Sequence, residues 1–425
     1  KFSQVVYRRA GIVLETVLSS TGMQPTSLYI HIPFCQHRCA YCDFNTYAGM
    51  EARIPAYVDA LCREIAWMGA SGGKNMTVHT VFFGGGTPTL LSPDQVERIL
   101  NTCRESFSLT PDAEISMEAN PGTVSLESLR QLRAAGVNRL SYGMQSAHPA
   151  DLRLLERIHD TYDVIRAVTW ARQAGFDNLS LDLIFGLPFQ SLERWRQTLE
   201  TALGLHPEHL SLYALTVEHG TPFQAWARRG LVPLPDDDLA ADMYDAASER
   251  LAQAGYFQYE ISNWACERNG KILSCRHNLQ YWRNLPYLGL GAGAHGYIAG
   301  HRTINVAAIP AYIERCRTMP ADDAFPAGPA TIQAQPIDRW TEIQETMMTG
   351  LRLTAEGVLA DAFKARFGIS LERVFGGEID RLIQQGLLEW AGEPRALRLS
   401  LRGRLLGNAV FRQFVGSEKP ADLGI

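Results

Sequence analysis

The chain has 425 residues, of which 46% are hydrophobic and 20% are charged, so it can bury a substantial globular core. The formal net charge of -5 offers no general attraction for nucleic acid or for an anionic membrane surface. No apolar run reaches the length of about 18 residues that a membrane-spanning helix needs. The eight cysteines are too sparse for a secreted disulfide framework. We therefore expect a cytoplasmic protein that has no transmembrane segment and does not bind nucleic acid.

Short hydrophobic segments alternate with stretches of helical periodicity along the chain. The predicted strands are "SLYIHI" (27–32), "HTVFFGG" (79–85), "EISMEAN" (114–120), "RLSYGMQS" (139–146), "LSLDLIFG" (179–186) and "HLSLYAL" (209–215). One helix is predicted over 52–70, and another after Ser92, where Pro93 is the first helical residue and Gln95 completes a capping box. Successive βα units predict buried parallel strands with helical crossovers. Six units are too few to close an eight-stranded barrel, so we expect an α/β fold, a partial (β/α)6 TIM-like barrel.

The composition changes after this barrel. Residues 317–339 are rich in Pro, Ala and Asp and are predicted to be a linker. Before it we expect an N-terminal extension at 1–26, with a short leading helix rather than a signal peptide, and then a barrel segment at 27–316. After it we expect a small, mainly helical, winged-helix-like domain at 340–425. Acidic residues offset the basic stretch 395–404, which favours a lid over a DNA-binding surface.

Three cysteines lie within eight positions directly after the first predicted strand. The spacing Cys35-x3-Cys39-x2-Cys42 suits a loop wrapped around a soft metal centre. Zinc usually takes four protein ligands, often as two separated pairs, whereas a 4Fe–4S cluster with three thiolates keeps one iron free. Three unrelated cysteines in one loop are the alternative. The position and spacing favour an iron–sulfur cluster.

A glycine-rich segment, "FFGGGTPTLL" (82–91), follows the second predicted strand. Glycines let a backbone approach a ligand closely and expose N–H groups to it. By itself the segment is equally compatible with a tight βα turn. Its place beside the cysteine loop favours the ligand-binding interpretation.

These motifs together resemble the radical S-adenosylmethionine (SAM) superfamily. Within it, the chain resembles the subfamily of the oxygen-independent coproporphyrinogen III oxidase (HemN) and the haem chaperone HemW. The motifs that carry the likeness are "LYIHIPFC", "YCDF", "FGGGTPT", "ExNPGT" (118–123), "RLSYGMQS", "DLIFGLP" (182–188) and "YEISNWA" (259–265). The likeness runs from about residue 27 to the C-terminus, so the terminal domain is expected to be of the HemN type.

The resemblance implies particular cofactor ligands. Cys35, Cys39 and Cys42 would hold a 4Fe–4S cluster whose open iron chelates SAM. The implied SAM contacts are Tyr29, Gly85, Gly86, Thr87, Glu118, Gln145, Arg157 and Asp182. Each of these alone is more often a capped strand end or a surface pair. Together at the carboxyl ends of barrel strands, they favour a cofactor site.

Two features separate the branches of this subfamily. The cysteine motif of the oxidase continues Cys-x-Cys, whereas here Phe44 follows Cys42 and Asp43, which resembles the chaperone. The segment "RHNLQYWRNLPYLGLGAGAHGY" (276–297) resembles the chaperone's haem motif. The implied haem contacts are His277, Asn278, Tyr281 and Trp282, with Cys275 and His295 as weaker candidate ligands. A lone histidine packed in an aromatic core is the ordinary alternative for His277.

Two functions remain open at this point. The first is a haem chaperone that carries a 4Fe–4S cluster and SAM and transfers haem to acceptors such as respiratory enzymes. Dimerisation and peripheral membrane association through partners are further expectations. The second is a radical SAM enzyme of porphyrin metabolism or a HemN-like radical methylase, in which SAM is cleaved reductively. Phe44 and the haem motif favour the chaperone, and no coproporphyrinogen oxidase activity is expected.

Overall fold

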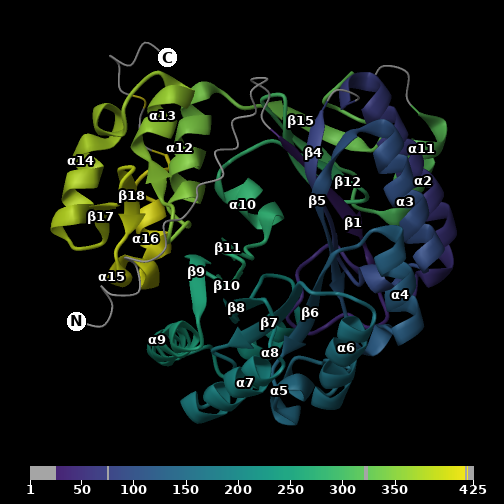
Figure 1. Ribbon diagram of the computed structural model, residues 1–425, viewed down its shortest axis with the longest axis horizontal. Coiled ribbons are helices and arrows are strands. Elements are labelled where there is room, and N and C mark those ends of the chain that lie inside the picture. The colour runs from purple at the N-terminus through teal and green to yellow at the C-terminus, as the bar shows by residue number, and fades with distance from the viewer. Residues whose placement is uncertain (1–24, 74–75, 320–323, 417–418, 420–425) are drawn as a thin grey trace.

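The computed structural model describes residues 25–73, 76–319, 324–416 and 419 (Figure 1). The predicted N-terminal extension and its leading helix lie outside these residues, apart from positions 25 and 26. None of the described helices is long and apolar enough to cross a lipid bilayer.

All six strands predicted for the barrel segment are present among the strands of the structure. The strands are β1 (Thr26–Ile32), β2 (Phe34–Cys35), β3 (Tyr47–Ala48), β4 (Thr77–Gly85), β5 (Ser108–Ala119), β6 (Arg139–Gln145), β7 (Leu179–Phe185), β8 (His209–Ala214), β9 (Tyr256–Glu260), β10 (Asn263–Arg268), β11 (Lys271–Ile272), β12 (Tyr287–Leu290), β13 (His295–Ile298), β14 (His301–Asn305), β15 (Thr331–Pro336), β16 (Val358–Leu359), β17 (Leu388–Ala391) and β18 (Ala396–Leu399).

Helices follow most of the parallel strands. The helices are α2 (Ile54–Met68), α3 (Pro93–Ser106), α4 (Leu126–Ala135), α5 (Pro149–Leu154), α6 (Thr161–Gln173), α7 (Leu192–Gly204), α8 (Pro222–Arg228), α9 (Asp237–Gln253), α10 (Arg276–Trp282), α11 (Ile309–Thr318), α12 (Arg339–Gly350), α13 (Ala360–Phe367), α14 (Leu371–Gln384), α15 (Leu401–Leu405) and α16 (Gly407–Phe411). The capping box predicted at Ser92 is present, since its side chain accepts from Gln95 N and the Gln95 side chain accepts in return.

The parallel part of the sheet runs in the order β8-β7-β6-β5-β4-β1, so each new strand lies beside the previous one. The sheet does not close. β8 pairs antiparallel with β10, and β1 pairs in parallel with β12, from which β13, β14 and β15 continue the other edge. The prediction of an open, partial barrel is therefore confirmed. The extensions beyond β8 and β1 were not predicted.

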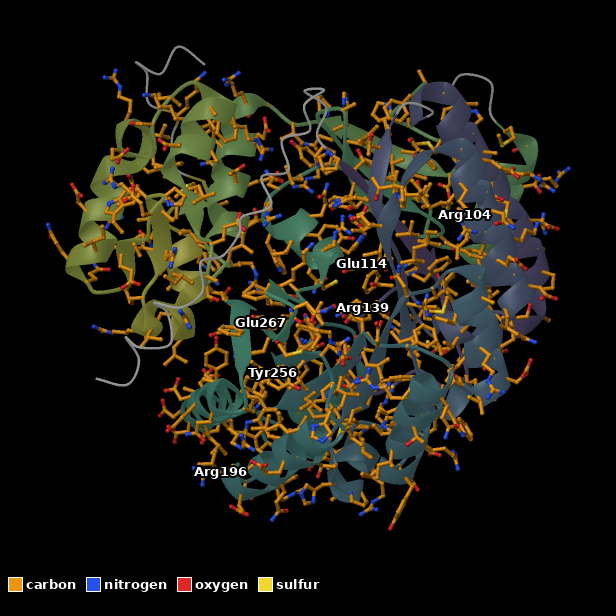
Figure 2. The ribbon with its side chains drawn as sticks, in the orientation of Figure 1. Arg104, Glu114, Arg139, Arg196, Tyr256 and Glu267 are labelled. Carbon is orange, nitrogen blue, oxygen red and sulfur yellow. The ribbon has the colours of Figure 1, made fainter. Side chains whose placement is uncertain are left out.

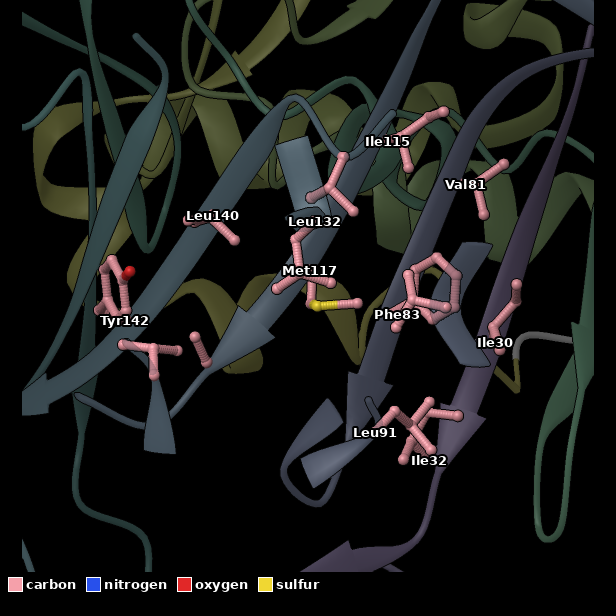
Figure 3. Close-up of a cluster of buried hydrophobic side chains, with 14 of the residues drawn as sticks. Ile30, Ile32, Val81, Phe83, Leu91, Ile115, Met117, Leu132, Leu140 and Tyr142 are labelled. Carbon is pink, nitrogen blue, oxygen red and sulfur yellow. The ribbon is translucent and has the colours of Figure 1, made fainter. Parts of the chain in front are cut away.

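The two faces of the curved sheet differ in chemistry. Its outer face is apolar and packs against helices such as α2, α3 and α4 (Figure 1). Figure 3 shows part of this layer, with Phe83, Met117 and Leu140 from three neighbouring strands. Strand residues alternate between the faces, so the intervening positions point into the barrel. Many of these are polar, including Ser27, Thr80, Ser116, Glu118, Arg139, Ser141, Ser180, Asp182, His209 and Ser211.

A polar inner face is unusual because the interior of a closed TIM barrel is filled by branched apolar side chains. The interior is therefore suited to hold a ligand rather than to form a packed core. The prediction of buried strands is confirmed. The alternation of polar residues shows, however, that the inner face of the sheet lines a cavity and does not form a packed core.

The C-terminal part has its own hydrophobic core, built from helices α12, α13, α14 and α16 and the small sheet β16-β18-β17. It lies beside α10, which is placed between this part and the strands of the barrel (Figure 1). The stretch predicted as a linker contains β15, which pairs with β14 along the edge of the main sheet. That portion, 331–336, is thus part of the sheet, because an edge strand satisfies its hydrogen bonds without needing an apolar sequence.

Candidate functional site

A cavity of about 200 Å³ lies inside the barrel. Its lining comes from strands β1, β4, β5, β6, β7 and β8 and from helix α10. The lining residues are Tyr29, Phe82, Glu118, Arg139, Ser141, Asp182, Ser211, Tyr213, His277, Asn278 and Tyr281. The cavity thus brings together residues that the sequence assigned to two different ligands.

The cysteine loop lies where β1 ends. Cys35 closes the short strand β2 and receives a contact from the Thr87 hydroxyl at 3.8 Å. Cys42 Sγ lies 3.9 Å from Thr46 Oγ1, and Cys39 Sγ lies 3.5 Å from a guanidinium nitrogen of Arg157. Burial raises the pKa of the Cys35 and Cys42 thiols, and the neighbouring thiols raise it further. A positively charged side chain or a bound cation at the loop would offset this increase in pKa and favour the thiolate form.

The three thiols fit an iron–sulfur cluster better than a mononuclear metal. Within the described residues, no group of three or more His, Cys, Asp or Glu side chains converges on a single metal position. In a cluster each thiolate binds a different iron, so the three sulfurs need not converge. The thiols are free, and each has a polar neighbour on the barrel rim. The donor set is therefore compatible with a cluster held by three cysteines.

The glycine-rich segment packs directly against the start of the cysteine loop. Gly86 N donates to Ile32 O and Thr87 N donates to Phe34 O, both at 2.8 Å. A Cβ on Gly86 would lie 2.5 Å from Phe34 O, and one on Gly85 would lie 2.4 Å from the ring of His31. Gly85 also has a φ of 111°, which disfavours any other residue. Close packing alone accounts for both glycines, whatever ligand lies nearby.

Two carboxylates face the cavity from β5 and β7, the strands on either side of β6. Glu118 Oε2 accepts a hydrogen bond from Gly85 N at 3.0 Å. The Ser141 hydroxyl lies 3.0 Å from both oxygens of Asp182. Burial raises the pKa of both groups, and the nearby charge of Asp182 helps to raise that of Glu118 to about 7. Such shifts are common where a carboxylate is arranged to bind or to exchange a proton.

Arg157 joins the cysteine loop to the end of β6. Its guanidinium donates to Gly143 O at 3.0 Å and contacts Cys39, while its Nε is buried without a partner. Gln145 ends β6 with a φ of 64°, at a register shift in its pairing with β7. Neither residue lines the inner cavity, and of the two only Arg157 has a recorded contact with a cysteine.

His277, on α10, is buried inside the barrel. Its Nδ1 lies 2.7 Å from Thr80 Oγ1, and its Nε2 lies 2.8 Å from Tyr281 Oη. Thr80 donates its own hydrogen to Ser27, so the network assigns the ring proton to Nδ1 and leaves the lone pair on Nε2. Burial lowers the pKa of His277 to about 3, so the ring is neutral at physiological pH. The ring also stacks on Phe82, with centroids 5.0 Å apart.

The structure separates Trp282 from the other residues of the predicted haem motif. Asn278 and Tyr281 line the cavity with His277, but Trp282 lies under the guanidinium of Arg352, 4.4 Å from the ring centroid. A one-residue step along a helix turns the side chain by about 100°, which takes Trp282 towards the C-terminal domain. Cys275 is buried beside Glu114, and burial raises the pKa of its thiol to about 12.

Sequence reasoning missed the polar floor of the cavity, including Arg139, Ser141 and Ser211. It also missed Glu114, which accepts from the backbone N–H of Arg276 and His277 and so holds the start of α10. A signal was available. Polar residues at every second position of otherwise hydrophobic strands indicate a lined interior.

Two family models match the chain. The model of the radical SAM superfamily matches residues 29–202, and that of the HemN C-terminal domain matches residues 337–406. Membership of the radical SAM superfamily implies SAM and a 4Fe–4S cluster as cofactors. The boundary of the second match falls close to the start of α12.

Several curated proteins are similar over nearly the whole chain. The chain is 40% identical over 391 residues to the "Heme chaperone HemW" of Bacillus subtilis, covering 92% of this chain and 99% of that protein. It is 38% identical over 418 residues to the protein of that name from Mycobacterium tuberculosis, covering 97% and 100%. The mouse "Radical S-adenosyl methionine domain-containing protein 1, mitochondrial" is 37% identical over 384 residues, covering 89% and 84%.

Among solved structures, coproporphyrinogen III oxidase (HemN) from Escherichia coli superposes with a TM-score of 0.77. It is 25% identical and covers 92% of this chain and 90% of its own. The identity to the HemW proteins is higher than the identity to this oxidase. The chain therefore belongs to the radical SAM superfamily and, within it, to the family of the heme chaperone HemW.

Proposed function

We propose that this protein is a haem chaperone, which binds haem and delivers it to acceptor proteins. The observation that carries the proposal is the shared cavity. Residues of the radical SAM motifs, Glu118 and Asp182, line the same space as His277 and Tyr281 of α10. Haem and SAM would therefore bind within reach of each other, so that one can influence the other. The names of the curated relatives support haem as the carried ligand.

In this proposal Cys35, Cys39 and Cys42 hold the 4Fe–4S cluster. A bound cluster supplies an electron-transfer centre and an open iron that can chelate SAM. The proximity of Arg157 to Cys39 supports a role for this guanidinium in balancing the thiolate charge or holding a carboxylate. Tyr29, Glu118 and Asp182 would complete the SAM contacts from inside the barrel. The proposed rim contacts of SAM are Gly85, Gly86, Thr87 and Gln145.

His277 is the proposed axial ligand of haem, with Asn278 and Tyr281 beside it. Its neutral ring keeps the lone pair on Nε2, which is the atom that could ligate iron. The Tyr281 hydroxyl bonds that atom in the structure and would have to move when iron binds. Trp282 would then support α10 from the side of the C-terminal domain rather than contact haem.

The test is anaerobic reconstitution of the cluster followed by a haem titration monitored by absorption. Wild type is expected to give a Soret band with a defined endpoint, and His277→Ala to weaken or shift that band. Tyr281→Phe removes the competing hydrogen bond, worth about 0.5–1.5 kcal/mol, so haem affinity should rise about two- to tenfold. His301→Ala, on β14, is the control. An unchanged spectrum in His277→Ala would remove this residue as the ligand.

A second candidate function is a radical SAM enzyme of porphyrin metabolism, favoured by the similarity in structure to HemN. Phe44 stands against it. Its side chain is 63% exposed in the cysteine loop, where the oxidase motif has a further cysteine. The protein would be incubated with coproporphyrinogen III, SAM and a reductant under anoxia. Protoporphyrinogen formation would establish the enzyme and overturn the chaperone as the sole function.

The proposed acceptors include respiratory enzymes, and the protein would meet a membrane only through such partners. Dimerisation, a cytoplasmic location and the division of the chain into extension, barrel, linker and C-terminal domain stay predictions. The separate hydrophobic core of residues 343–414 supports the last of these.

A further inference from the structure

Arg139 is a buried cation inside the barrel. It is the first residue of β6, its exposed fraction is 2%, and it lines the cavity. Figure 2 shows it near the centre of the molecule beside Glu114. An arginine is almost never buried to this extent unless it is paired, because a guanidinium loses a large hydration energy when it leaves water.

No such pairing is present among the described residues. The Nε of Arg139 is buried without a hydrogen-bond partner. The structure records no hydrogen bond or ion pair from its two terminal nitrogens to a described residue. Arg139 is one of the residues that line the cavity. The guanidinium therefore keeps its fork of donors available to whatever enters the space.

The acidic groups nearby are already engaged. The oxygens of Glu114 accept from the Cys275 thiol and from the first N–H groups of α10. Asp182 is held by serine hydroxyls, and Glu118 by Gly85 N. Glu114 and Asp182 therefore contribute only a through-space attraction to Arg139.

Two histidines, His209 and His277, also feel the charge of Arg139, and both rings are neutral. His209 Nδ1 lies 2.8 Å from Ser180 Oγ, and its Nε2 lies 2.8 Å from Tyr259 Oη, so both ring nitrogens are occupied. Burial and the charge of Arg139 together lower the pKa values of His209 and His277. Arg139 is thus a positive charge whose acidic and histidine neighbours are already hydrogen-bonded to other groups, and it lines a space that a ligand can enter.

We propose that Arg139 is the anchor for a carboxylate group of a ligand that enters the barrel, where Ser141 and Ser211 line the cavity beside it. A guanidinium binds a carboxylate through two parallel hydrogen bonds, and such pairs are strongest where water is excluded. The carboxylate has two chemical sources here, a porphyrin propionate or the amino-acid end of SAM. The first source rests on the proposed function.

This site is distinct from Arg157 on the rim. Arg157 donates to Gly143 O, and Arg139 lies four residues earlier on the same strand. At about 3.3 Å per residue, the two positions on β6 are about 13 Å apart along the strand. A SAM carboxylate chelated at the cluster beside Arg157 would leave Arg139 unpaired. The geometry therefore favours the propionate of a carried porphyrin.

The test compares ligands that differ only in the carboxylate. Haem and its dimethyl ester share the iron and the macrocycle, and each is titrated into the reconstituted wild-type protein and into Arg139→Gln. Wild type is expected to prefer haem. Arg139→Gln should bind haem about 10- to 100-fold more weakly and should lose most of this preference. Arg139→Lys keeps the positive charge but cannot donate two parallel hydrogen bonds. Its haem affinity should fall between those of wild type and Arg139→Gln.

Arg98→Gln is the matched control, since it removes one positive charge from an exposed ion pair with Asp59. SAM is titrated in parallel. A loss of SAM affinity in Arg139→Gln with unchanged haem affinity would assign the carboxylate to SAM. Affinities for haem and SAM that both match the Arg98→Gln control would overturn the proposal.

If circular dichroism shows that Arg139→Gln is unfolded, the comparison of haem with its dimethyl ester in wild type becomes the test. Equal affinity of wild type for haem and its ester would then overturn a propionate anchor. Failure of wild type to bind haem at all would instead contradict the proposed function, and the SAM titration of Arg139→Lys would decide the role of Arg139.

Discussion

At the scale of single residues, the environment of each side chain that lines the cavity determines its protonation state. Burial raises the pKa of both Glu118 and Asp182, the charge of Asp182 raises that of Glu118 further, and each carboxylate accepts hydrogen bonds that oppose the shift. The pKa of His277, in the same cavity, is lowered instead, because burial penalises the charged form of a histidine as it does that of a carboxylate. The cavity therefore favours the neutral forms of these side chains more than water does, while Arg139 stays a buried cation.

The pH dependence of SAM binding follows from Glu118. Its pKa is about 7, so the carboxylate is mostly protonated at pH 6 and mostly ionised at pH 8. A carboxylate that holds the ammonium or a ribose hydroxyl of SAM should make affinity rise over this interval. Glu118→Gln should flatten the dependence and lower affinity at pH 8 about tenfold. Isothermal titration at several pH values measures this.

Glu127→Gln, in the first turn of α4, is the control for that experiment. Glu127 is exposed on α4, so this substitution removes a surface charge and should leave the pH dependence of SAM affinity unchanged. A SAM affinity that does not vary between pH 6 and pH 8 in wild type would show that Glu118 does not contact the cofactor.

Among the elements, the loop after β4 has the most direct influence on the cysteines. Its backbone donates to two carbonyl groups of the segment that leads from β1 into the cysteine loop. Thr87 extends the contact to Cys35. Because this contact is made by main-chain atoms, it leaves almost no room for a side chain. The glycines hold the loop that would carry the cluster in place.

Gly86→Ala should destabilise the protein by about 1–3 kcal/mol, the usual cost of overpacking. The new Cβ would meet backbone oxygens of Phe34 and Ile32, which cannot rotate away. Chemical denaturation and iron content after reconstitution both report the effect. Gly122→Ala is the matched control, since nothing lies within 4 Å of its added Cβ. Equal stability of the two variants would contradict the proposed packing role.

At the scale of the whole molecule, the C-terminal part is joined to the barrel through α10 and the segment after it. Arg283 forms an ion pair with Glu356, with Nη2 and Oε2 separated by 2.7 Å. Arg366 donates to the carbonyl oxygens of Arg283 and Asn284, and Arg302 pairs with Glu345. These contacts place α10, which carries His277, between two separately packed cores. A structural change in either part would therefore alter the position of His277, the proposed haem ligand.

A double-mutant cycle tests this junction. Arg283→Ala and Glu356→Ala are expected to show a coupling energy of about 1 kcal/mol, near the upper end for a partly exposed pair. The readout is the denaturation midpoint together with the haem affinity. The pair Arg317 and Glu314, which lies on the surface of α11, is the control and should couple less. No coupling at Arg283 and Glu356 would mean that this pair does not help to hold the domain.

Much of the architecture is predictable from local signals. The order of parallel strands follows from alternating βα units, and the capping box at Ser92 marks the start of α3 correctly. The cysteine spacing and Phe44 indicate the family through residue identity and spacing alone. These features are determined by neighbouring residues, so the sequence contains all the information that they need.

The strands beyond the parallel core could not be predicted in this way. β15 has a polar, alanine-containing sequence, and it becomes a strand because the edge of β14 is available to it. Helix α10 is short, and its position in the barrel depends on Glu114 from a strand some 160 residues away. Such contacts are non-local and leave little trace in either segment alone.

The sequence by itself determined the fold class, the cysteine motif and the residue types available to the site. The tertiary structure alone decided which of them share a cavity. It placed His277 and Tyr281 with Glu118 and Asp182, turned Trp282 away, and left Arg139 facing the cavity without a hydrogen-bond partner among the described residues. The reason is that side-chain convergence depends on strand register and helix rotation, and a shift of one residue reverses the face on which each group lies.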